Sequence, residues 1–442
     1  MGRTVSDASG YAPEDDEFDP RIDDFVSKER KYLHFDLPLT KDRRTALSFS
    51  AGELRSHPFW PLLAFEDVER RVKKNDDGET TFEEKKRPIK FASHSDAALF
   101  EWYSKVLAET YEARLEAEPF TDSILAYRSG MGNNITHAKG LFDEITHRGD
   151  CTAVAVDVSG FFDNIDHTVL RENLCNVLST ARLAEHDFRI FQRMTRFSWV
   201  ESDAVQARLG DDYGRGGRIC SPKQFRDLVR SKSASLVKEN LDSHGIPQGT
   251  PLSGLYANIS MLRVDAELYS YMKSLRGSYR RYSDDIAVVI PDAVDPKTAI
   301  NKIEEILKSV ALSLSAKKTE TSSFFTVGHE IQATKPFQYL GFTFDGQRKL
   351  IRQSSLNRYY TKMHSGIRAK VRAAKNNGVP RDDIFLRELY RRYTHFGKSR
   401  NFPRYAYRSA RILGAPEIGK QLRNHMSTFR SALKYYLDRA YD

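Results

Sequence analysis

The chain has 442 residues, a formal net charge of +9 and three cysteines. Charged residues at 29% and hydrophobic residues at 40% are ordinary globular values, which excludes a largely disordered chain. No apolar run approaches the roughly 20 residues that a membrane helix needs, and no secretory signal or disulfide framework is recognisable, so we expect a cytoplasmic protein without a membrane partner.

The N-terminal part of the chain carries few chemical signals. Residues 1–20 are acidic and punctuated by Pro, Gly and Ser, which predicts a disordered arm. Apolar residues with helical spacing predict a helix over 95–115, and residues 72–79 are typical of an exposed turn.

A strand is predicted over residues 152–158, where three valines alternate with two alanines and Asp157. The valines share one face, which we expect in the core. Small alanines beside a carboxylate predict an open, shallow cleft over Asp157 on the other face. The turn that follows carries Phe161 and Phe162, and either ring could face that cleft.

Glycine and proline define a loop over residues 245–251, and the sequence after Pro251 predicts that a helix begins at Ser253. The loop therefore presents Gln248 and the backbone of Gly249 at the mouth of a helix, where a phosphate or a base pair binds readily. By itself, this segment is an ordinary turn.

Residues 279–290 contain two aromatic and β-branched runs around a polar centre, which predicts a hairpin with Asp284 and Asp285 at its tip. Adjacent carboxylates repel each other, so the tip favours a bound cation, with a solvated turn as the alternative. A strand ending at Asp157 beside this hairpin would complete a set of three carboxylates. That set suits Mg²⁺, and two such ions would support nucleotidyl transfer.

The positive charge is concentrated in the C-terminal region, which has a helical pattern. Residues 351–442 hold 21 Lys and Arg against 6 Asp and Glu, whereas residues 1–350 hold 48 against 54. Basic residues interleaved with aromatic ones favour nucleic acid, and a solvated helical surface is the alternative. The candidate contacts are Arg391, Arg392, Lys398 and Arg400.

Taken in order, the segments resemble the reverse transcriptases over roughly residues 120–345. Six segments carry the resemblance: 124–132, 157–167, 245–258, 282–285, 315–320 and 337–342. The resemblance implies an α+β fold of the right-hand polymerase type, with fingers, a ferredoxin-like palm and a helical thumb. It also implies an enzyme, an RNA-directed DNA polymerase that acts by nucleotidyl transfer.

The resemblance assigns the metal site and a general acid. Asp157, Asp284, Asp285 and the carbonyl of Val158 are expected to hold two Mg²⁺ ions, with Mn²⁺ as the alternative ion. Lys318 is expected near the leaving pyrophosphate, an assignment that rests on the resemblance alone.

The resemblance also assigns the substrate contacts. Arg128 is expected to hold the incoming triphosphate, and Phe162 to exclude a 2′-hydroxyl. The other expected nucleotide contacts are Gln248, Gly249 and Tyr282. A primer-grip hairpin is expected to contact nucleic acid through Tyr339, Leu340 and Gly341.

The implied organisation has four parts along the chain. They are a disordered arm over 1–20, the N-terminal and fingers region over 21–150, the palm over 151–350 with an inserted element at about 176–243, and a basic helical thumb over 351–442. The implied partners are an RNA template or a noncoding RNA, the DNA product and deoxynucleotide triphosphates. A homo-oligomer or a partner defence protein is left open.

Within the family, the Ser-Asp-Asp box and the Pro-Gln-Gly-Thr-Pro-Leu-Ser loop most resemble the bacterial abortive-infection and defence-associated (unknown-group) reverse transcriptases. Retron and group II intron-like enzymes are the alternatives within the family. An RNA-dependent RNA polymerase and a non-catalytic RNA-binding scaffold are the rival functions. The ring of Phe162 disfavours the first rival, and the intact carboxylates disfavour the second.

Overall fold

The structure is a computed structural model of the chain and describes residues 25–45, 47–74, 80–315, 318–398 and 401–442. The predicted N-terminal arm and Arg400 lie outside these residues. Contacts between residues divide the chain into two compact units. The first unit comprises the residues up to Arg128, Val158–Leu268 and Glu304–Leu314; the second comprises Ser129–Asp157, Tyr269–Ile303 and Ser315–Asp442. Segments far apart in the sequence therefore build each unit.

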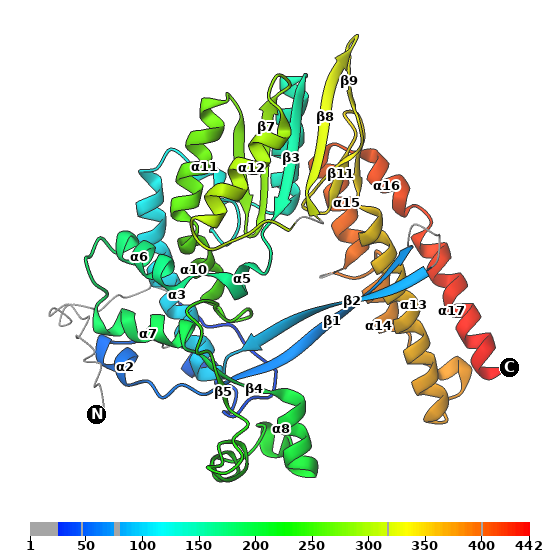
Figure 1. Cartoon of the computed structure of the whole chain (residues 1–442). Helices are drawn as coiled ribbons and strands as arrows, with labels where there is room; N and C mark the ends of the chain where they lie inside the picture. The colour runs from blue at the N-terminus through cyan, green and yellow to red at the C-terminus, as the bar shows by residue number, and fades with distance from the viewer. Residues whose placement is uncertain (1–24, 46, 75–79, 316–317, 399–400) are drawn as a thin grey trace. The chain divides into compact units, whose positions relative to one another are not determined.

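The first unit contains helices and a four-stranded sheet in the order β2-β1-β4-β5, from which the β1–β2 ribbon projects (Figure 1). β1 and β2 form a long antiparallel ribbon, and β4 runs parallel to β1. The elements of this unit are α1 (Lys41–Thr45), α2 (Ala51–Ser56), β1 (Leu62–Lys74), β2 (Thr80–Phe91), α3 (His94–Glu116), α5 (Phe161–Asn164), α6 (His167–Val177), α7 (Glu185–Thr195), β4 (Ser198–Glu201), α8 (Ser202–Leu209), α9 (Pro222–Gln224), β5 (Lys238–Glu239) and α10 (Ser253–Ser260).

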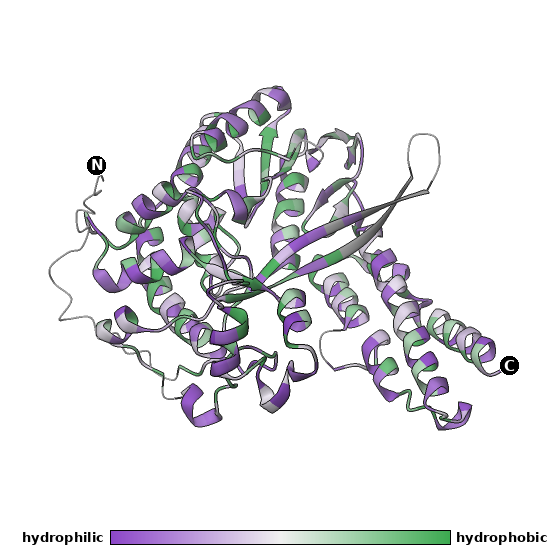
Figure 2. Cartoon of the chain, turned by 60° about the horizontal axis from the view of Figure 1, so that its bottom comes forward, coloured by the Kyte–Doolittle hydropathy of each residue, from purple (hydrophilic) through white to green (hydrophobic). Residues whose placement is uncertain are grey.

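The sequence element expected as an insertion, at about 176–243, extends this sheet rather than forming a separate module. It supplies β4 and β5, and its apolar side chains pack in one cluster with Phe35 and Leu63. The ribbon itself is largely hydrophilic, as Figure 2 shows. An ion pair of 2.9 Å between Glu66 and Lys86 is typical of its described part.

The second unit contains a five-stranded antiparallel sheet in the order β6-β7-β3-β8-β9 and a three-stranded sheet in the order β10-β11-β12. Its elements are α4 (Asn134–Arg148), β3 (Cys151–Asp157), β6 (Ser278–Tyr282), β7 (Asp285–Pro291), β8 (Glu320–Val327), β9 (Glu330–Ala333), β10 (Phe337–Tyr339), β11 (Phe342–Phe344), β12 (Lys349–Ile351), α13 (Gln353–Asn376), α14 (Arg387–Tyr393), α15 (Phe402–Leu413), α16 (Pro416–Leu422) and α17 (His425–Tyr441). Two further helices, α11 (Leu262–Ser274) and α12 (Pro296–Lys308), have residues in both units.

β3 is the central strand of the larger sheet, and both of its faces are covered. The valine face is buried as expected, with Val154 and Val156 at most 2% exposed. The expected open face over Asp157 is shorter than predicted, because Ala153 is also buried, in a cluster that includes residues of α4 and of β10 and β11. Only Ala155 and Asp157 are partly exposed there. β3 is therefore accessible to solvent on this face only near its C-terminal end.

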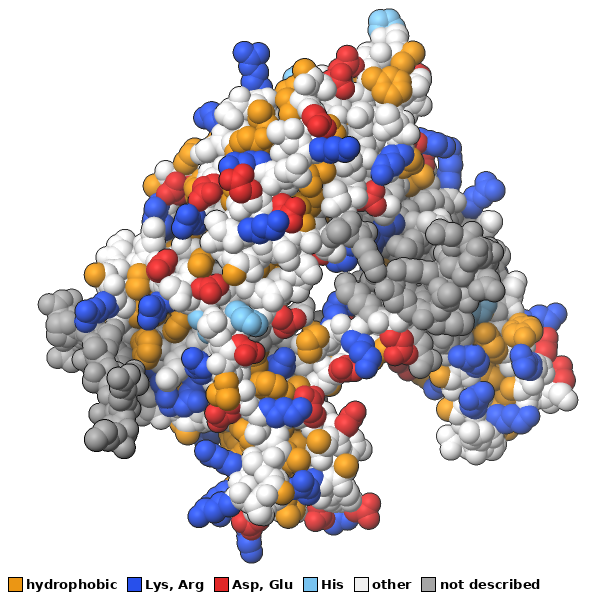
Figure 3. Space-filling view, viewed as in Figure 1, with side chains coloured by type: hydrophobic (Ala, Val, Ile, Leu, Met, Phe, Trp, Pro, Cys, Tyr) orange, Lys and Arg blue, Asp and Glu red, His pale blue; other side chains and the backbone are white. Residues whose placement is uncertain are grey.

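The C-terminal helices share their core with the small sheet. Apolar side chains on one stripe of α13, from Leu356 to Val371, pack in the same cluster as Phe337, Phe342 and Phe344. The opposite stripe of α13 carries exposed basic residues such as Lys362 and Arg372. Figure 3 shows Lys and Arg side chains gathered over the region of α13 and α17.

Several predicted elements are confirmed. The helix expected over 95–115 is α3, the hairpin around the paired aspartates is β6 and β7, and the helix expected at Ser253 is α10. Across the described ranges, no helix is long and apolar enough to cross a membrane.

Candidate active site

The register of β3 and β7 brings two of the three expected carboxylates together. Asp157, the last residue of β3, lies directly opposite Asp285, the first residue of β7. Residues opposite each other on antiparallel strands point to the same face, so both side chains leave the sheet on one side. Asp284 sits in the two-residue turn before β7, next to Ser283, whose φ is +60°. The hairpin tip predicted from the sequence is therefore confirmed.

Burial and neighbouring carboxylates raise the pKa of Asp284 and of Asp285. Burial raises the pKa of Asp285 to about 7, and repulsion from Asp284 and then Asp157 adds to that effect, although Lys318 and Arg352 oppose it. Burial likewise raises the pKa of Asp284, again with a contribution from Asp157. Half-buried carboxylates that resist ionisation are a recognised mark of a functional site. The three carboxylates therefore lack enough nearby positive charge to offset their own negative charge.

Lys318 supplies one compensating cation. Its ammonium forms an ion pair with Asp157, whose side chain is 15% exposed. Among the residues that the structure describes, no group of three or more His, Cys, Asp or Glu side chains is arranged to hold a metal ion. The chemistry of the donors fits a hard divalent cation, but Asp157 can become a ligand only if Lys318 withdraws from it.

A second cluster of expected residues lies in the first unit, around the loop over 245–251. The carbonyl of Gln248 accepts a hydrogen bond of 2.8 Å from the backbone N–H of Lys90 in β2. Gly249 has a φ of +123°, and a Cβ there would lie 2.8 Å from the Lys90 carbonyl. Only glycine fits this approach. The loop is therefore docked on β2, a neighbour that the sequence did not indicate.

Lys90 is a functional candidate that the sequence analysis missed. Burial lowers the pKa of its ammonium, which is 5.5 Å from the Phe197 ring and 5.3 Å from the Trp199 ring. A partly desolvated cation beside a substrate loop is suited to bind phosphate. The only sequence signal was its place at the end of a basic run, Lys85 to Lys90.

The two neighbouring phenylalanines have different environments. Phe161 is 4% exposed, whereas Phe162 is half-buried, and their rings meet edge to face at 5.5 Å. The carbonyl of Phe162 accepts a hydrogen bond of 2.9 Å from Ile246 of the loop. Phe161 thus anchors the turn, and Phe162 is the ring with an accessible surface beside the loop.

The model of the family described as reverse transcriptase (RNA-dependent DNA polymerase) matches residues 72–344, more than half of the chain. The chain belongs to the reverse transcriptase family. The expected α+β fold of the right-hand polymerase type is thereby confirmed, and the family is described as one of RNA-dependent DNA polymerases. No curated protein sequence matches the chain.

Solved structures similar to this reverse transcriptase include telomerases. Telomerase from Candida albicans, in complex with a TWJ fragment of telomeric RNA, is 12% identical with a TM-score of 0.41, over 87% of this chain and 56% of that one. Apo telomerase from Candida tropicalis is 10% identical with a TM-score of 0.41, over 85% of this chain and 60% of that one. The chain therefore spans less than two thirds of the length of either telomerase.

Arg128 is expected to hold the incoming triphosphate, and in the structure its guanidinium is already paired within its own unit. Its guanidinium makes a bidentate pair with Glu112 at 2.7–3.0 Å and donates further hydrogen bonds to Thr121 and to the carbonyl of Ile124. All five N–H donors are used, and the side chain is 5% exposed. A triphosphate would have to displace these partners. Arg128 instead fixes the loop in which it lies.

The expected primer grip is a tight hairpin between β10 and β11, but one of its residues is buried. Leu340 and Gly341 form the turn with φ values of +45° and +91°. Tyr339 is 4% exposed within the core of the second unit, so its ring is not available to nucleic acid. The strand alternation places Tyr339 inward, which leaves the turn residues as the candidate contacts.

The basic residues expected to bind nucleic acid lie on and after α14. Arg391, Arg392 and Lys398 are exposed.

Tyr282, expected beside the nucleotide, ends β6 with its ring 5.9 Å from that of His137. Arg352, at the start of α13, is a further cation that acts on Asp285, and no motif in the sequence marked it.

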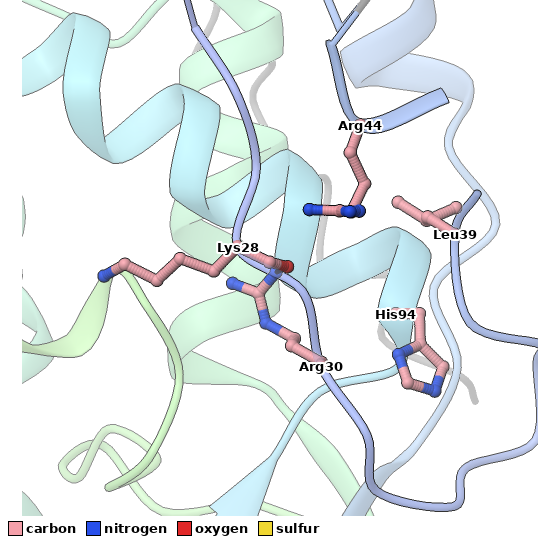
Figure 4. Close-up of a pocket in the computed structure, with 5 residues that line it drawn as sticks. All are labelled: Lys28, Arg30, Leu39, Arg44 and His94. Atoms are coloured by element: carbon pink, nitrogen blue, oxygen red, sulfur yellow. Dashed lines mark hydrogen bonds between the residues drawn. The ribbon is translucent and has the colours of Figure 1, made fainter. Parts of the chain in front are cut away.

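A separate pocket of about 170 Å³ lies in the first unit (Figure 4). It is lined by Lys28, Arg30, Leu39, Arg44 and His94. Arg30 is already paired with Glu101 at 2.7 Å, and Lys28 points away from the other four side chains in Figure 4. Ligand pockets usually measure about 300–1,000 Å³, so this one is too small for a nucleotide.

Proposed function

We propose that the protein copies an RNA strand into DNA by divalent-metal-dependent nucleotidyl transfer at Asp157, Asp284 and Asp285. The observation that supports this most directly is the pairing of Asp157 with Asp285, because it concentrates negative charge where burial already disfavours it. Oxygen donors of this kind suit two Mg²⁺ ions, with Mn²⁺ as the alternative. When bound, such ions neutralise phosphate charge and make the primer hydroxyl a better nucleophile.

In this proposal, the three aspartates and the carbonyl of Val158 hold the metal ions. Val158 forms an isolated bridge with Leu314, and the two hydrogen bonds around the bridge use neither its carbonyl nor its N–H. Lys318 leaves Asp157 when a metal ion binds, and its ammonium then holds a proton for the departing pyrophosphate. Until a metal ion binds, the ion pair with Lys318 offsets the negative charge of the Asp157 carboxylate.

The nucleotide contacts of the proposal come from the loop of the first unit. Gln248 and Gly249 pack under the new base pair, and Phe162 occupies the space that a 2′-hydroxyl would need. Lys90, rather than Arg128, binds the triphosphate, because it is the cation that adjoins the loop without a carboxylate partner of its own among the described ion pairs. Residues 151–350 act as the palm, and the basic helices over 351–442 act as the thumb.

We also propose a role in bacterial antiviral defence, with an associated noncoding RNA, in the cytoplasm. The support is the resemblance of the Ser-Asp-Asp box and the Pro-Gln-Gly loop to defence-associated reverse transcriptases. Sequencing the nucleic acid that copurifies with the protein tests this role. A single structured RNA with its partial DNA copy would support it, whereas random cellular RNA would contradict it.

The test of the catalytic proposal is incorporation of each nucleotide type on an RNA template, with and without Mg²⁺. Asp157→Asn and Asp284→Asn should abolish incorporation of deoxynucleotides, because each removes a metal ligand. Asp292→Asn is the matched control, since Asp292 is exposed and follows directly after β7. Near-normal incorporation by either active-site variant would overturn the assignment.

A further inference from the structure

Tyr127 has a backbone conformation that bulky residues seldom adopt. Its φ is +60°, in the left-handed region, where an aromatic residue is an outlier. The residues on both sides hold it there: the carbonyl of Ala126 accepts a hydrogen bond of 2.7 Å from the Asn258 side chain, and Arg128 is fixed through all five of its donors. Such strain persists only where the surrounding structure imposes it, and it is concentrated at functional sites.

The strain places an aromatic ring on the first turn of α10. A Cβ at Gly254 would lie 2.7 Å from two carbons of the Tyr127 ring, so glycine is what lets the ring lie against the helix. The neighbouring residue Ser253 donates a hydrogen bond of 2.5 Å to the carbonyl of Pro247, directly before Gln248. The ring is therefore tied, through one turn of helix, to the loop that presents Gln248.

Tyr127 is nonetheless 53% exposed. Packing alone does not explain a strained backbone that holds an aromatic ring half in water, because a glycine would relieve the strain. Aromatic rings beside a nucleic-acid site bind bases by stacking, and they do so with little regard to sequence.

We propose that Tyr127 is a stacking surface for an unpaired base of the strand that is being copied, next to the base that pairs with the incoming nucleotide. This inference rests on the proposed function. A paired base is already covered on both faces by its neighbours, whereas an unpaired base in the single-stranded part of the template has a free face. Tyr127 positions the template and takes no part in the chemistry.

The test uses the full chain with Asp284→Asn, so that binding is measured without turnover. A primer–template with an RNA overhang carries 2-aminopurine at each overhang position in turn, and its fluorescence reports stacking. We expect quenching at one position. Tyr127→Ala should abolish that quenching and weaken binding about 5- to 100-fold, the range for losing one stacked base, whereas Tyr127→Phe should keep both.

Two further variants separate stacking from packing. Tyr127→Gly should raise the melting temperature, because glycine accepts φ of +60° without strain, and yet it should lose the quenching. Gly254→Ala should displace the ring and also lose the quenching. A lower melting temperature for Tyr127→Gly, or unchanged quenching in Tyr127→Ala, would overturn the inference.

The two proposals fail in different ways. Quenching that depends on Tyr127, in a protein whose unmutated form incorporates no nucleotide, would retain the stacking site and reject the proposed function. Incorporation that is normal in Tyr127→Ala at limiting template would retain the function and reject the stacking site.

Discussion

The carboxylate turn and the loop around Gln248 are built on opposite electrostatic principles. Around Asp157, Asp284 and Asp285, like charges are gathered and half-buried, and burial together with this repulsion raises the pKa of Asp284 and of Asp285. Around Gln248, the polar groups are already paired: its carbonyl with the N–H of Lys90, and the Ser253 hydroxyl with a loop carbonyl.

The carboxylate turn and the loop around Gln248 therefore prepare a site in two different ways. The carboxylate turn is electrostatically incomplete until a cation binds, so it stores a cost in the metal-free protein. The loop is complete in itself and therefore rigid before any substrate arrives. Neutralising substitutions in the first region should accordingly stabilise the fold, whereas substitutions in the second should destabilise it.

The largest expected effect is on the loop side, at the two phenylalanines. Phe161→Ala should lower the free energy of unfolding by about 3–5 kcal/mol, because it empties a buried ring site. Phe162→Ala should cost less stability and should instead admit ribonucleotides, with a gain on the order of a hundredfold over the unmodified enzyme. Denaturant unfolding and competitive incorporation assays measure the two. Strict preference for deoxyribose in both Phe162→Ala and Phe162→Val would contradict the gate.

The next effect has the opposite sign and concerns Asp285. Because the folded pKa is raised to about 7, the metal-free protein is penalised as pH rises from the unfolded value towards and beyond 7. Asp285→Asn should therefore stabilise the metal-free protein at pH 8 by up to about 4 kcal/mol, and the gain should vanish near pH 4. Thermal melts across this range with chelator present measure it, with Asp292→Asn as the control. A gain that does not vary with pH would contradict the charge explanation.

Arg128 and Lys90 sharpen the comparison, because the proposal gives Lys90 the triphosphate contact that the sequence analysis assigned to Arg128. Arg128→Gln should destabilise the fold by about 2–4 kcal/mol, since it leaves the partly exposed Glu112 without its partner, while the KM for deoxynucleotides stays close to normal. Lys90→Gln should raise that KM with little change in unfolding. A raised KM with unchanged stability in Arg128→Gln would restore Arg128 as the triphosphate ligand.

The smallest effect per residue is expected on the exposed basic surface. Replacing Arg391, Arg392, Lys398 and Arg400 by Gln should flatten the dependence of log affinity on log salt by about 0.7–0.9 per lost phosphate contact. Stability should be unchanged, because the described members of the set are exposed. Binding titrations at several salt concentrations measure the slope. Equivalent changes at exposed Lys223, Arg226 and Arg230 should leave it unaltered, and an equal slope in both variants would show that the C-terminal set faces solvent.

The carboxylate pair was predictable because strand alternation and the Asp-Asp turn are local signals. Asp157 and Asp285 needed only the assumption that two strands pair, and the register supplied the rest. The covering of β3 on its alanine face was only partly predictable, because α4 precedes β3 directly but the other covering residues lie in β10 and β11, nearly two hundred residues later.

Partners of individual side chains were harder to predict. Nothing in the sequence indicates that Glu112 of α3, rather than a phosphate, satisfies Arg128. For Tyr339, the motif marked the hairpin, but only the structure shows that its ring lies in the core. Lys90 and Tyr127 gain their interest from neighbours that are distant in sequence.

The central place of β3 has a consequence for how the chain is made. Its two strand partners begin about 130 and 160 residues after it ends. At a synthesis rate of about 5–20 residues per second, β3 leaves the ribosome roughly 8–33 s before both partners exist. During that interval, β3 is an unpaired, valine-rich strand that is prone to aggregate. Productive synthesis of this enzyme therefore depends on shielding one short segment until the rest of its sheet has been translated.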